Sequence, residues 1–265
     1  MLGAIIGDVV GSRFEFHNYR DKKFVLFDSK CFFTDDTVMT CAVADALLYN
    51  KDIKNNLRKF GNLFPGRGYG GSFAAWLNKE FDGPYYSFGN GAAMRVSAVG
   101  WIAKDEKEVI ELSRKVTEVT HDHPEGLKGA EVTAMCVFMA FNGFPKSEIE
   151  KYAVANYPEI LAFDYEILKK TYKFNETCQN TVPQAIYCFL ISDNFEDCLR
   201  TSVSIGGDTD TLCAISCAIA EGYYGVPAWM KKEILKYFSK KDRQLLLKPI
   251  NELAKKCGID NYISL

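Results

Sequence analysis

The chain has 265 residues, of which 48% are hydrophobic and 25% are charged, and its formal net charge is −2. This composition is typical of a folded globular protein, and the length fits one large domain or two small ones. The near-neutral charge argues against a surface that coats nucleic acid. No apolar run reaches the roughly 18–20 residues that a membrane-spanning helix needs.

The start of the chain and its cysteines indicate in which cellular compartment the protein is expected. Residues 1–10 are apolar apart from Asp8, and they lack the basic leader and the small-residue cleavage site of a signal peptide. The chain has nine cysteines and no Cys-x-x-Cys pair, and Cys41, Cys136 and Cys188 lie in apolar surroundings. We therefore expect reduced core cysteines in a cytoplasmic protein, rather than a disulfide framework or a zinc site.

Apolar residues recur mostly with the period of a helix. Residues 25–33 are an exception, and they predict either a short strand or an extended loop. Gly- and Pro-containing turns separate the periodic segments, and no linker-like or low-complexity stretch divides the chain. The sequence thus predicts an all-α, multi-helix fold with a single domain over residues 1–265. Helices are expected over residues 38–48, 92–102, 107–119, 125–140, 182–190, 195–204, 211–223 and 229–238.

Glu15 is the first residue with candidate chemistry. It lies between Phe14 and Phe16, and burial among these rings would raise the pKa of its carboxyl group. A raised pKa suits a general acid or base, or a labile metal ligand. The alternative is a surface glutamate in a loop.

Two acidic motifs each precede an apolar helical run. They are FTDDT at residues 33–37 and IGGDTDT at residues 205–211. One Asp or Thr in each could cap the following helix, but a cap accounts for only part of each motif. Clustered carboxylates repel one another unless a cation compensates them, and carboxylates with hydroxyls suit Mg²⁺, Mn²⁺ or Ca²⁺ rather than Zn²⁺. The two motifs together predict one divalent-metal centre.

Three loops between these motifs are candidates for ligand contacts. Residues 87–91 are glycine-rich and lead into small residues, which suits phosphate binding, with Phe88 available to stack on a base; an ordinary turn fits equally well. Residues 66–71 lack the Lys-Ser/Thr of a P-loop, so they form either a plain connector or a loop that covers substrate. In residues 120–126, His121 and His123 are better suited to hydrogen bonding or helix capping than to a hard-oxygen metal centre.

Taken in order, several segments resemble the ADP-ribosylglycohydrolase family, the group typified by dinitrogenase-reductase-activating glycohydrolase. No single motif is diagnostic, but the two acidic motifs with a Gly-Asn-Gly loop between them are specific, and the chain after about residue 225 carries no family motif. The matching segments are residues 3–8 with Glu15, residues 34–37, 89–95, 120–126 and 206–211.

The resemblance implies an all-α orthogonal bundle with two Mg²⁺ ions, or Mn²⁺, at the base of an ADP-ribose cleft. Glu15 and Asp36 would be the catalytic carboxylates, and the sequence does not decide whether Glu15, Asp35 or Asp36 handles the proton. The metal ligands would be Thr34, Asp35, Asp36, Asp208, Asp210 and Thr211. The substrate-binding residues would be Ser87, Phe88, Gly89, Asn90, Gly91 and His121.

The implied activity is metal-dependent hydrolysis of the glycosidic bond between ADP-ribose and an acceptor. Members of the family differ in that acceptor, which can be arginine, serine, a nucleobase or another group, and the motifs do not choose among them. The expected partner is an ADP-ribosylated protein or small molecule, and nucleic acid only if it is itself ADP-ribosylated; we expect no membrane partner and a monomer. Two alternatives are a non-catalytic ADP-ribose-binding or crystallin-like relative, and a metal-dependent nucleotide phosphohydrolase.

Overall fold

The computed structural model describes residues 1–260 and 262–264. Within them the regular structure is helical, and the only β-type pairing is an isolated bridge between Gly89 and Thr177. The prediction of an all-α fold is therefore confirmed. None of the helices in this part of the chain combines the length and the apolar character that a bilayer-spanning segment requires.

The helices follow one another mostly with short connections, apart from long loops between η1 and α2 and between α4 and α5. The α-helices are α1 (Leu2–Gly11), α2 (Asp35–Tyr49), α3 (Ile53–Leu63), α4 (Gly71–Leu77), α5 (Gly91–Met94), α6 (Ser97–Ile102), α7 (Glu106–Thr117), α8 (Pro124–Phe141), α9 (Lys146–Asn156), α10 (Tyr165–Thr171), α11 (Cys178–Leu190), α12 (Phe195–Ile205), α13 (Thr209–Tyr224), α14 (Ala228–Glu233), α15 (Lys240–Asp242) and α16 (Lys248–Lys256). Short 3-10 or π turns are η1 (Ser12–Phe14), η2 (Pro158–Ala162), η3 (Ile234–Tyr237) and η4 (Arg243–Leu247).

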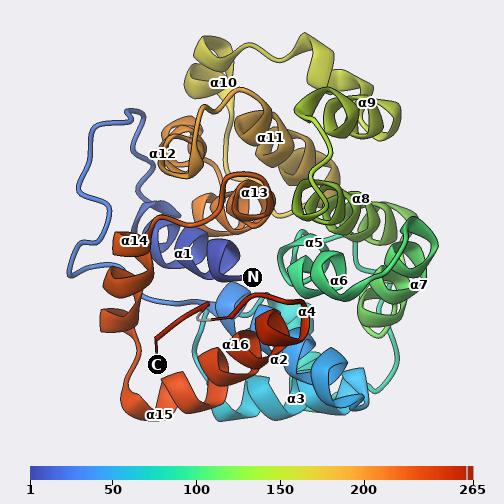
Figure 1. Ribbon diagram of the computed structural model, residues 1–265. Helices are drawn as coiled ribbons and strands as arrows, with labels where there is room; N and C mark the ends of the chain where they lie inside the picture. The colour runs from blue at the N-terminus through green and yellow to red at the C-terminus, as the bar shows by residue number, and fades with distance from the viewer. Residues whose placement is uncertain (261, 265) are drawn as a thin grey trace.

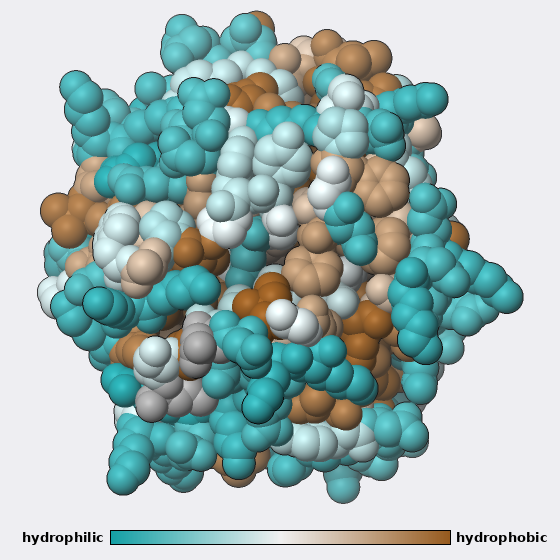
Figure 2. Space-filling view, viewed as in Figure 1, coloured by the Kyte–Doolittle hydropathy of each residue, from teal (hydrophilic) through white to brown (hydrophobic). Residues whose placement is uncertain are grey.

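The helix pair α1 and α13 forms the centre of the molecule (Figure 1). All residues of α1 are buried, as are those of α13 from Thr209 to Glu221. Helices α8, α11 and α12 pack against α13 on one side, and α2 packs against α1 on the other. The outer face carries mostly polar side chains with small apolar patches between them (Figure 2), as expected for a globular surface.

Glycines bring α1 and α13 into close contact. Gly3, Gly7 and Gly11 are spaced four residues apart, so they lie along one face of α1. A Cβ atom at Gly3 would lie 2.2 Å from the carbonyl oxygen of Cys217, and one at Gly7 would lie 2.2 Å from that of Cys213. The two helices therefore run antiparallel with their backbones in contact, a separation that any larger side chain would prevent.

Local sequence explains where the helices begin. At the start of α2, the Thr34 hydroxyl accepts a hydrogen bond from the backbone N–H of Asp36. At the start of α8, Pro124 occupies the first turn and the His123 ring accepts from the N–H of Glu125, so the expected helix cap near Pro124 is confirmed. All nine cysteines are free, and only Cys257 is less than fully buried.

The structure differs from the predicted elements in several places. The helix expected over residues 92–102 is interrupted at Arg95 and Val96, between α5 and α6, and the one over 229–238 divides into α14 and η3. Of the two alternatives for residues 25–33, the structure has the loop and not the strand. Helix α1 is not predicted because it is buried on every face and so has no polar stripe. Helices α3, α4, α9 and α10 add to the structure between the expected helices, and α15 and α16 follow the last of them.

We predict that Gly7→Ala destabilises the fold strongly. The new methyl group would overlap the backbone of α13 at Cys213, and the free energy of unfolding should fall by about 1–3 kcal/mol or more, despite the higher helix propensity of alanine. Urea unfolding measures the change. The control is Gly83→Ala, because a Cβ atom there meets nothing within 4 Å. Equal stability of both variants would contradict the close contact.

Candidate active site and metal centre

A buried carboxylate on α1 positions the start of α2. Asp8 accepts hydrogen bonds from the Thr34 hydroxyl at 2.7 Å, from the Thr34 N–H at 3.0 Å and from the Thr37 N–H at 3.0 Å. These N–H groups belong to the N-terminal turn of a helix, where a negative charge is favourable. Burial raises the pKa of Asp8 to about 6. Asp8 thus ties the first acidic motif to the central helix pair.

A tight turn positions the start of α13. Gly206 and Gly207 both have positive φ angles, of 73° and 83°, which favour glycine. The side chain of Asn18 accepts a hydrogen bond from the Gly207 N–H at 2.9 Å and donates one to the Gly207 carbonyl at 3.0 Å. This clamp directs Asp208, which follows, and Asp210, in the first turn of α13, toward the same side of the helix.

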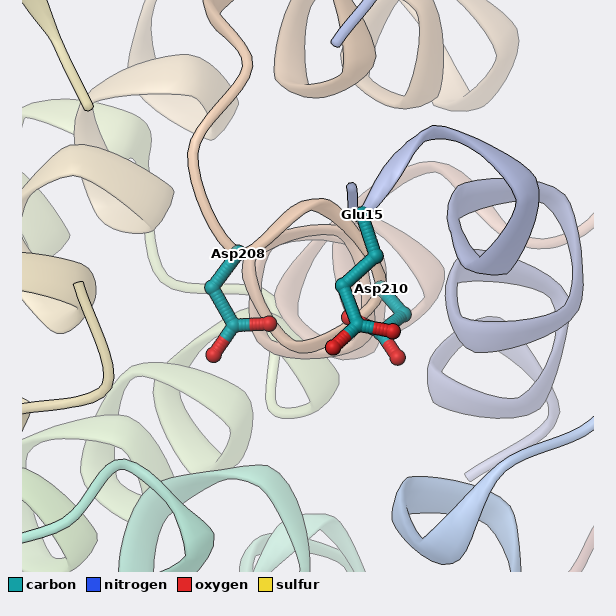
Figure 3. A group of neighbouring side chains, drawn as sticks. All are labelled: Glu15, Asp208 and Asp210. Atoms are coloured by element: carbon teal, nitrogen blue, oxygen red, sulfur yellow. The ribbon is translucent and has the colours of Figure 1, made fainter. Parts of the chain in front are cut away.

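The two acidic motifs meet at this point. Carboxylate oxygens of Glu15, Asp208 and Asp210 all lie within 4.8 Å of one another, in front of the N-terminus of α13 (Figure 3). From α2, Asp36 accepts a hydrogen bond through Oδ2 from the Thr211 hydroxyl at 3.1 Å. Motifs that are about 170 residues apart in the sequence therefore form one oxygen-rich cluster.

Repulsion and burial raise the pKa of every carboxyl group in the cluster. The pKa of Glu15 rises to about 8, first because of burial and then because of the charges of Asp210, Asp8 and Glu176. Burial also raises the pKa of Asp208 to about 6 and that of Asp35, Asp36 and Asp210 well above the usual range. The described residues place no Lys or Arg in an ion pair with these groups.

The donor set fits a hard divalent cation. Asp36 Oδ1 is buried and has no hydrogen-bond partner among the described residues, so an oxygen atom faces the cluster without compensation. Asp208 begins α13 but makes no capping hydrogen bond; its carboxylate instead accepts from the Asn90 side chain at 2.7 Å. A metal ion would satisfy both features, because oxygen ligands of this kind suit Mg²⁺ or Mn²⁺.

The cluster forms the floor of a cavity of about 490 Å³. Most of the candidate residues from the sequence line this cavity. They are Glu15, Asp35, Asp36, Ser87, Phe88, Gly89, Asn90, Gly91, His121, Asp208, Asp210 and Thr211. Thr34 does not line it, because its hydroxyl donates to Asp8 and accepts from the N–H of Asp36. A ligand role for Thr34 stays a prediction.

The glycine-rich loop 87–91 forms one wall of the cavity. It pairs with residues 176–178 through the hydrogen bonds from the Asn90 N–H to the Glu176 carbonyl, at 2.7 Å, and from the Cys178 N–H to the Phe88 carbonyl, at 2.9 Å. Phe88 is 42% exposed and packs near the ring of His123 at 5.0 Å between centroids. Gly68, Gly70 and Gly71 also line the cavity, so the loop 66–71 borders it.

Three residues at the site were not predicted from the sequence. Asp8 is a charged residue within an apolar run, which is a recognisable signal, but its local sequence does not indicate which groups it contacts. Glu176 lines the cavity from a polar stretch without any motif. Arg95 lines it too, but the sequence pattern placed it inside a helix, and only the break between α5 and α6 turns it inward.

Comparison with known proteins identifies the family. The family model "ADP-ribosylglycohydrolase" matches residues 1–259. The chain is 27% identical to ADP-ribosylhydrolase ARH3 of Homo sapiens, over 85% of this chain and 84% of that protein, and 27% identical to ARH3 of Danio rerio, over 85% and 82%. An uncharacterized protein of Archaeoglobus fulgidus is 28% identical over 63% of this chain and 56% of that protein.

A solved structure supports the fold independently. An "ADP-ribosylglycohydrolase-related protein complex" superposes with a TM-score of 0.70, covers 94% of both chains and is 22% identical in sequence. At that identity the likeness concerns the fold alone, whereas the family model covers nearly the whole chain. The chain therefore belongs to the ADP-ribosylglycohydrolase family, a family of hydrolases.

Proposed function

We propose that the protein hydrolyses the glycosidic bond between ADP-ribose and an acceptor group, with Mg²⁺ or Mn²⁺ bound at the acidic cluster. One observation carries the proposal: both acidic motifs converge on the floor of a cavity whose wall is the glycine-rich loop 87–91. The curated relatives carry the name ADP-ribosylhydrolase, which points to the same substrate class.

We assign the metal to the oxygen atoms that converge on the cavity floor. Two ions fit the number of carboxylates better than one, since several acidic groups remain uncompensated by any basic side chain. When bound, the metal would hold the hydroxyls of the distal ribose and lower the pKa of a bound water. The ligands would be Asp35, Asp36, Asp208, Asp210 and Thr211, with Thr34 as the further candidate.

Proton transfer falls to Glu15 in this proposal. Its carboxyl group is half-buried and lines the cavity, and burial, the first cause of its raised pKa, favours the protonated form that a general acid needs. Asp36 is engaged with the Thr211 hydroxyl and is more deeply buried, so it serves better as a ligand and as negative charge beneath the reacting sugar. As the leaving group departs, the carboxylates stabilise the oxocarbenium character of the ribose.

The other end of the cavity suits the adenosine diphosphate portion. Gly89 and Gly91 allow a diphosphate to approach the backbone of the loop closely. Phe88 offers a half-exposed ring for adenine to stack on. This orientation places the distal ribose over the acidic cluster and the scissile bond next to Glu15.

The alternatives are less well supported. A non-catalytic relative should lack ligands from one acidic motif, whereas both motifs are intact and meet in space. A nucleotide phosphohydrolase would release phosphate rather than ADP-ribose, so product analysis separates it. The cytoplasmic location, the monomeric state and the restriction to ADP-ribosylated partners stay predictions.

We predict that a divalent cation stabilises the protein more strongly as the pH rises. Without metal, the pKa of Glu15 is raised from 4.5 to about 8, so the folded state binds more protons than the unfolded state across that range, and stability falls as the pH increases through it. Thermal melts in EDTA, Mg²⁺ or Mn²⁺ at about pH 5 and about pH 8 test this. Identical melting temperatures with and without cation at the higher pH would contradict the metal centre; NaCl at matched ionic strength is the control.

We predict that Asp208→Asn folds normally but loses at least about a hundredfold in activity. Asparagine can still accept the hydrogen bond from Asn90, but it removes one charge that holds the metal. Release of ADP-ribose from arginine-, serine- and nucleobase-linked substrates, followed by chromatography with and without Mg²⁺, measures the loss. The control is Asp105→Asn, which changes a helix cap outside the cavity. Full turnover by a folded Asp208→Asn protein would remove Asp208 from the metal site.

The edge of the cavity beside Glu15 and Glu176, here called the rim, bears on which acceptor group is preferred. Glu176 lines the cavity and its charge contributes to the raised pKa of Glu15, so the two carboxyl groups face the same space. Phe16 and Phe174, which are close in sequence to Glu15 and Glu176, have exposed rings that are stacked with centroids 5.9 Å apart. Negative charge beside aromatic faces favours a planar cation. We propose that a guanidinium acceptor is preferred at this rim over a neutral one.

We predict that Glu176→Gln lowers kcat/KM about fivefold for arginine-linked ADP-ribose, because a rim carboxylate contributes a modest attraction to a cation. The serine-linked substrate carries no positive charge at that position, so its kcat/KM should stay unchanged. Parallel assays of both substrates measure the ratio. Glu150→Gln, an exposed position outside the cavity, is the control. An equal effect of Glu176→Gln on both linkages would contradict a role in acceptor choice.

A further inference from the structure

Arg95 is a buried cation without a carboxylate partner. Its side chain is 1% exposed, and among the described residues it makes no ion pair. Its guanidinium donates instead to the carbonyl oxygen of Val116, at 3.2 Å, at the C-terminal end of α7, and to the Thr120 hydroxyl at 2.7 Å. The negative end of a helix partly compensates the charge. Burial lowers the pKa of Arg95 to about 10, so it stays charged at neutral pH.

The Thr120 hydroxyl connects Arg95 to His121. Thr120 is fully buried, and its oxygen lies 2.8 Å from Nδ1 of the His121 ring. Because an arginine can only donate, the hydroxyl oxygen accepts from Arg95. The described residues offer the hydroxyl proton no acceptor other than Nδ1. The hydroxyl therefore donates to Nδ1, and in the neutral ring the proton must lie on Nε2.

The Nε2 atom of His121 faces the glycine-rich wall of the cavity. Cβ atoms added at Gly89 and Gly91 would lie 3.6 and 3.5 Å from Nε2, so the ring edge runs beside the backbone of this loop. His121 lines the cavity, and Nε2 makes no hydrogen bond to any residue that the structure describes. Burial and the nearby charge of Arg95 hold the pKa of His121 well below its usual range, which keeps the ring neutral.

We propose that Arg95 and Thr120 are positioning residues, which hold His121 as the Nε2–H tautomer so that it donates a hydrogen bond to an anionic oxygen of the bound ligand. The chain of donors runs from the guanidinium through the hydroxyl to the ring, and each hydrogen bond polarises the next. Part of the positive character of Arg95 thus reaches the cavity without protonating the histidine. The hydrogen bond from Thr120 also fixes the orientation of the His121 ring, in the same way that buried hydrogen-bond partners orient metal-binding histidines.

The inference rests on the proposed function only for the identity of the ligand, a diphosphate such as that of ADP-ribose. The tautomer is a property of the ligand-free protein and is tested separately. The chain has only three histidines, so the ring nitrogens of His121 can be assigned in a ¹⁵N NMR spectrum by comparison with His121→Gln. We expect Nε2 to carry the proton and Nδ1 to show the shift of a hydrogen-bonded acceptor.

The variants Thr120→Val and Thr120→Ser separate this role from packing. Valine keeps the shape of the side chain but removes the hydroxyl, so the Nδ1 resonance should move and the Kd for ADP-ribose, measured by calorimetry, should rise about five- to tenfold. Serine restores the hydroxyl, and both readouts should return close to those of the wild type. Thr133→Val is the matched control, because the buried Thr133 hydroxyl has no hydrogen-bond partner among the described residues.

Three results overturn the inference: a proton on Nδ1 in the wild type, an unchanged Kd for Thr120→Val, or a Thr120→Ser variant that remains as weak as Thr120→Val. A wild-type protein that shows the Nε2–H tautomer but does not bind ADP-ribose would instead count against the proposed function. In that case inorganic pyrophosphate is the probe for the anionic ligand. If the wild type and Thr120→Val had equal Kd values for pyrophosphate, the proposed positioning role of Arg95 and Thr120 would be overturned. The two failures are therefore distinguishable.

Discussion

The direct backbone contact between α1 and α13 is the constraint on which the rest of the structure depends. Gly3, Gly7 and Gly11 lie about one helical turn apart on α1 and have no side chains to separate the two helices. The carbonyl oxygens of α13 therefore approach α1 closely. Asp8 on α1 then holds the start of α2, while the start of α13 lies beside the end of α1. If the two helices moved apart by the width of a methyl group, the acidic motifs of α2 and α13 would no longer share one site.

This arrangement brings together charges that repel one another. Burial and mutual repulsion raise the pKa of every carboxyl group at the cavity floor, and no basic side chain among the described residues forms an ion pair there. The helix starts contribute positive potential from their N–H groups, but those at the start of α2 are already paired. The N–H groups of Thr34 and Thr37 donate to Asp8, and those of Asp35 and Asp36 donate to the Arg67 carbonyl and the Thr34 hydroxyl. The remaining imbalance is the physical reason to expect a divalent cation, and it is also what makes the site suitable for a substrate that develops positive charge during hydrolysis.

Arg95, the buried cation at the cavity, complements the acidic cluster. Arg95 lines the cavity, forms no ion pair with the acidic cluster among the described residues, and is connected through the Thr120 hydroxyl to His121. The cavity thus has an acidic end, which suits a metal and a sugar, and an end with hydrogen-bond donors, which suits a diphosphate. In the proposed function, a ligand with these two parts would bind with its sugar toward the acidic end, so that its glycosidic bond would lie beside Glu15 and Glu176.

The sequence by itself determined the helical class, the two acidic motifs and the glycine-rich loop, because periodicity and short-range motifs are local properties of the chain. It could not predict α1, which lacks a polar face because it is buried all round, nor the break that turns Arg95 inward, since local propensity favours one continuous helix there. The role of Asp8 and the position of Glu176 arise from contacts between segments far apart in the chain. Only the tertiary structure decided these, because they depend on how closely α1 and α13 pack, and that distance is a property of two helices together.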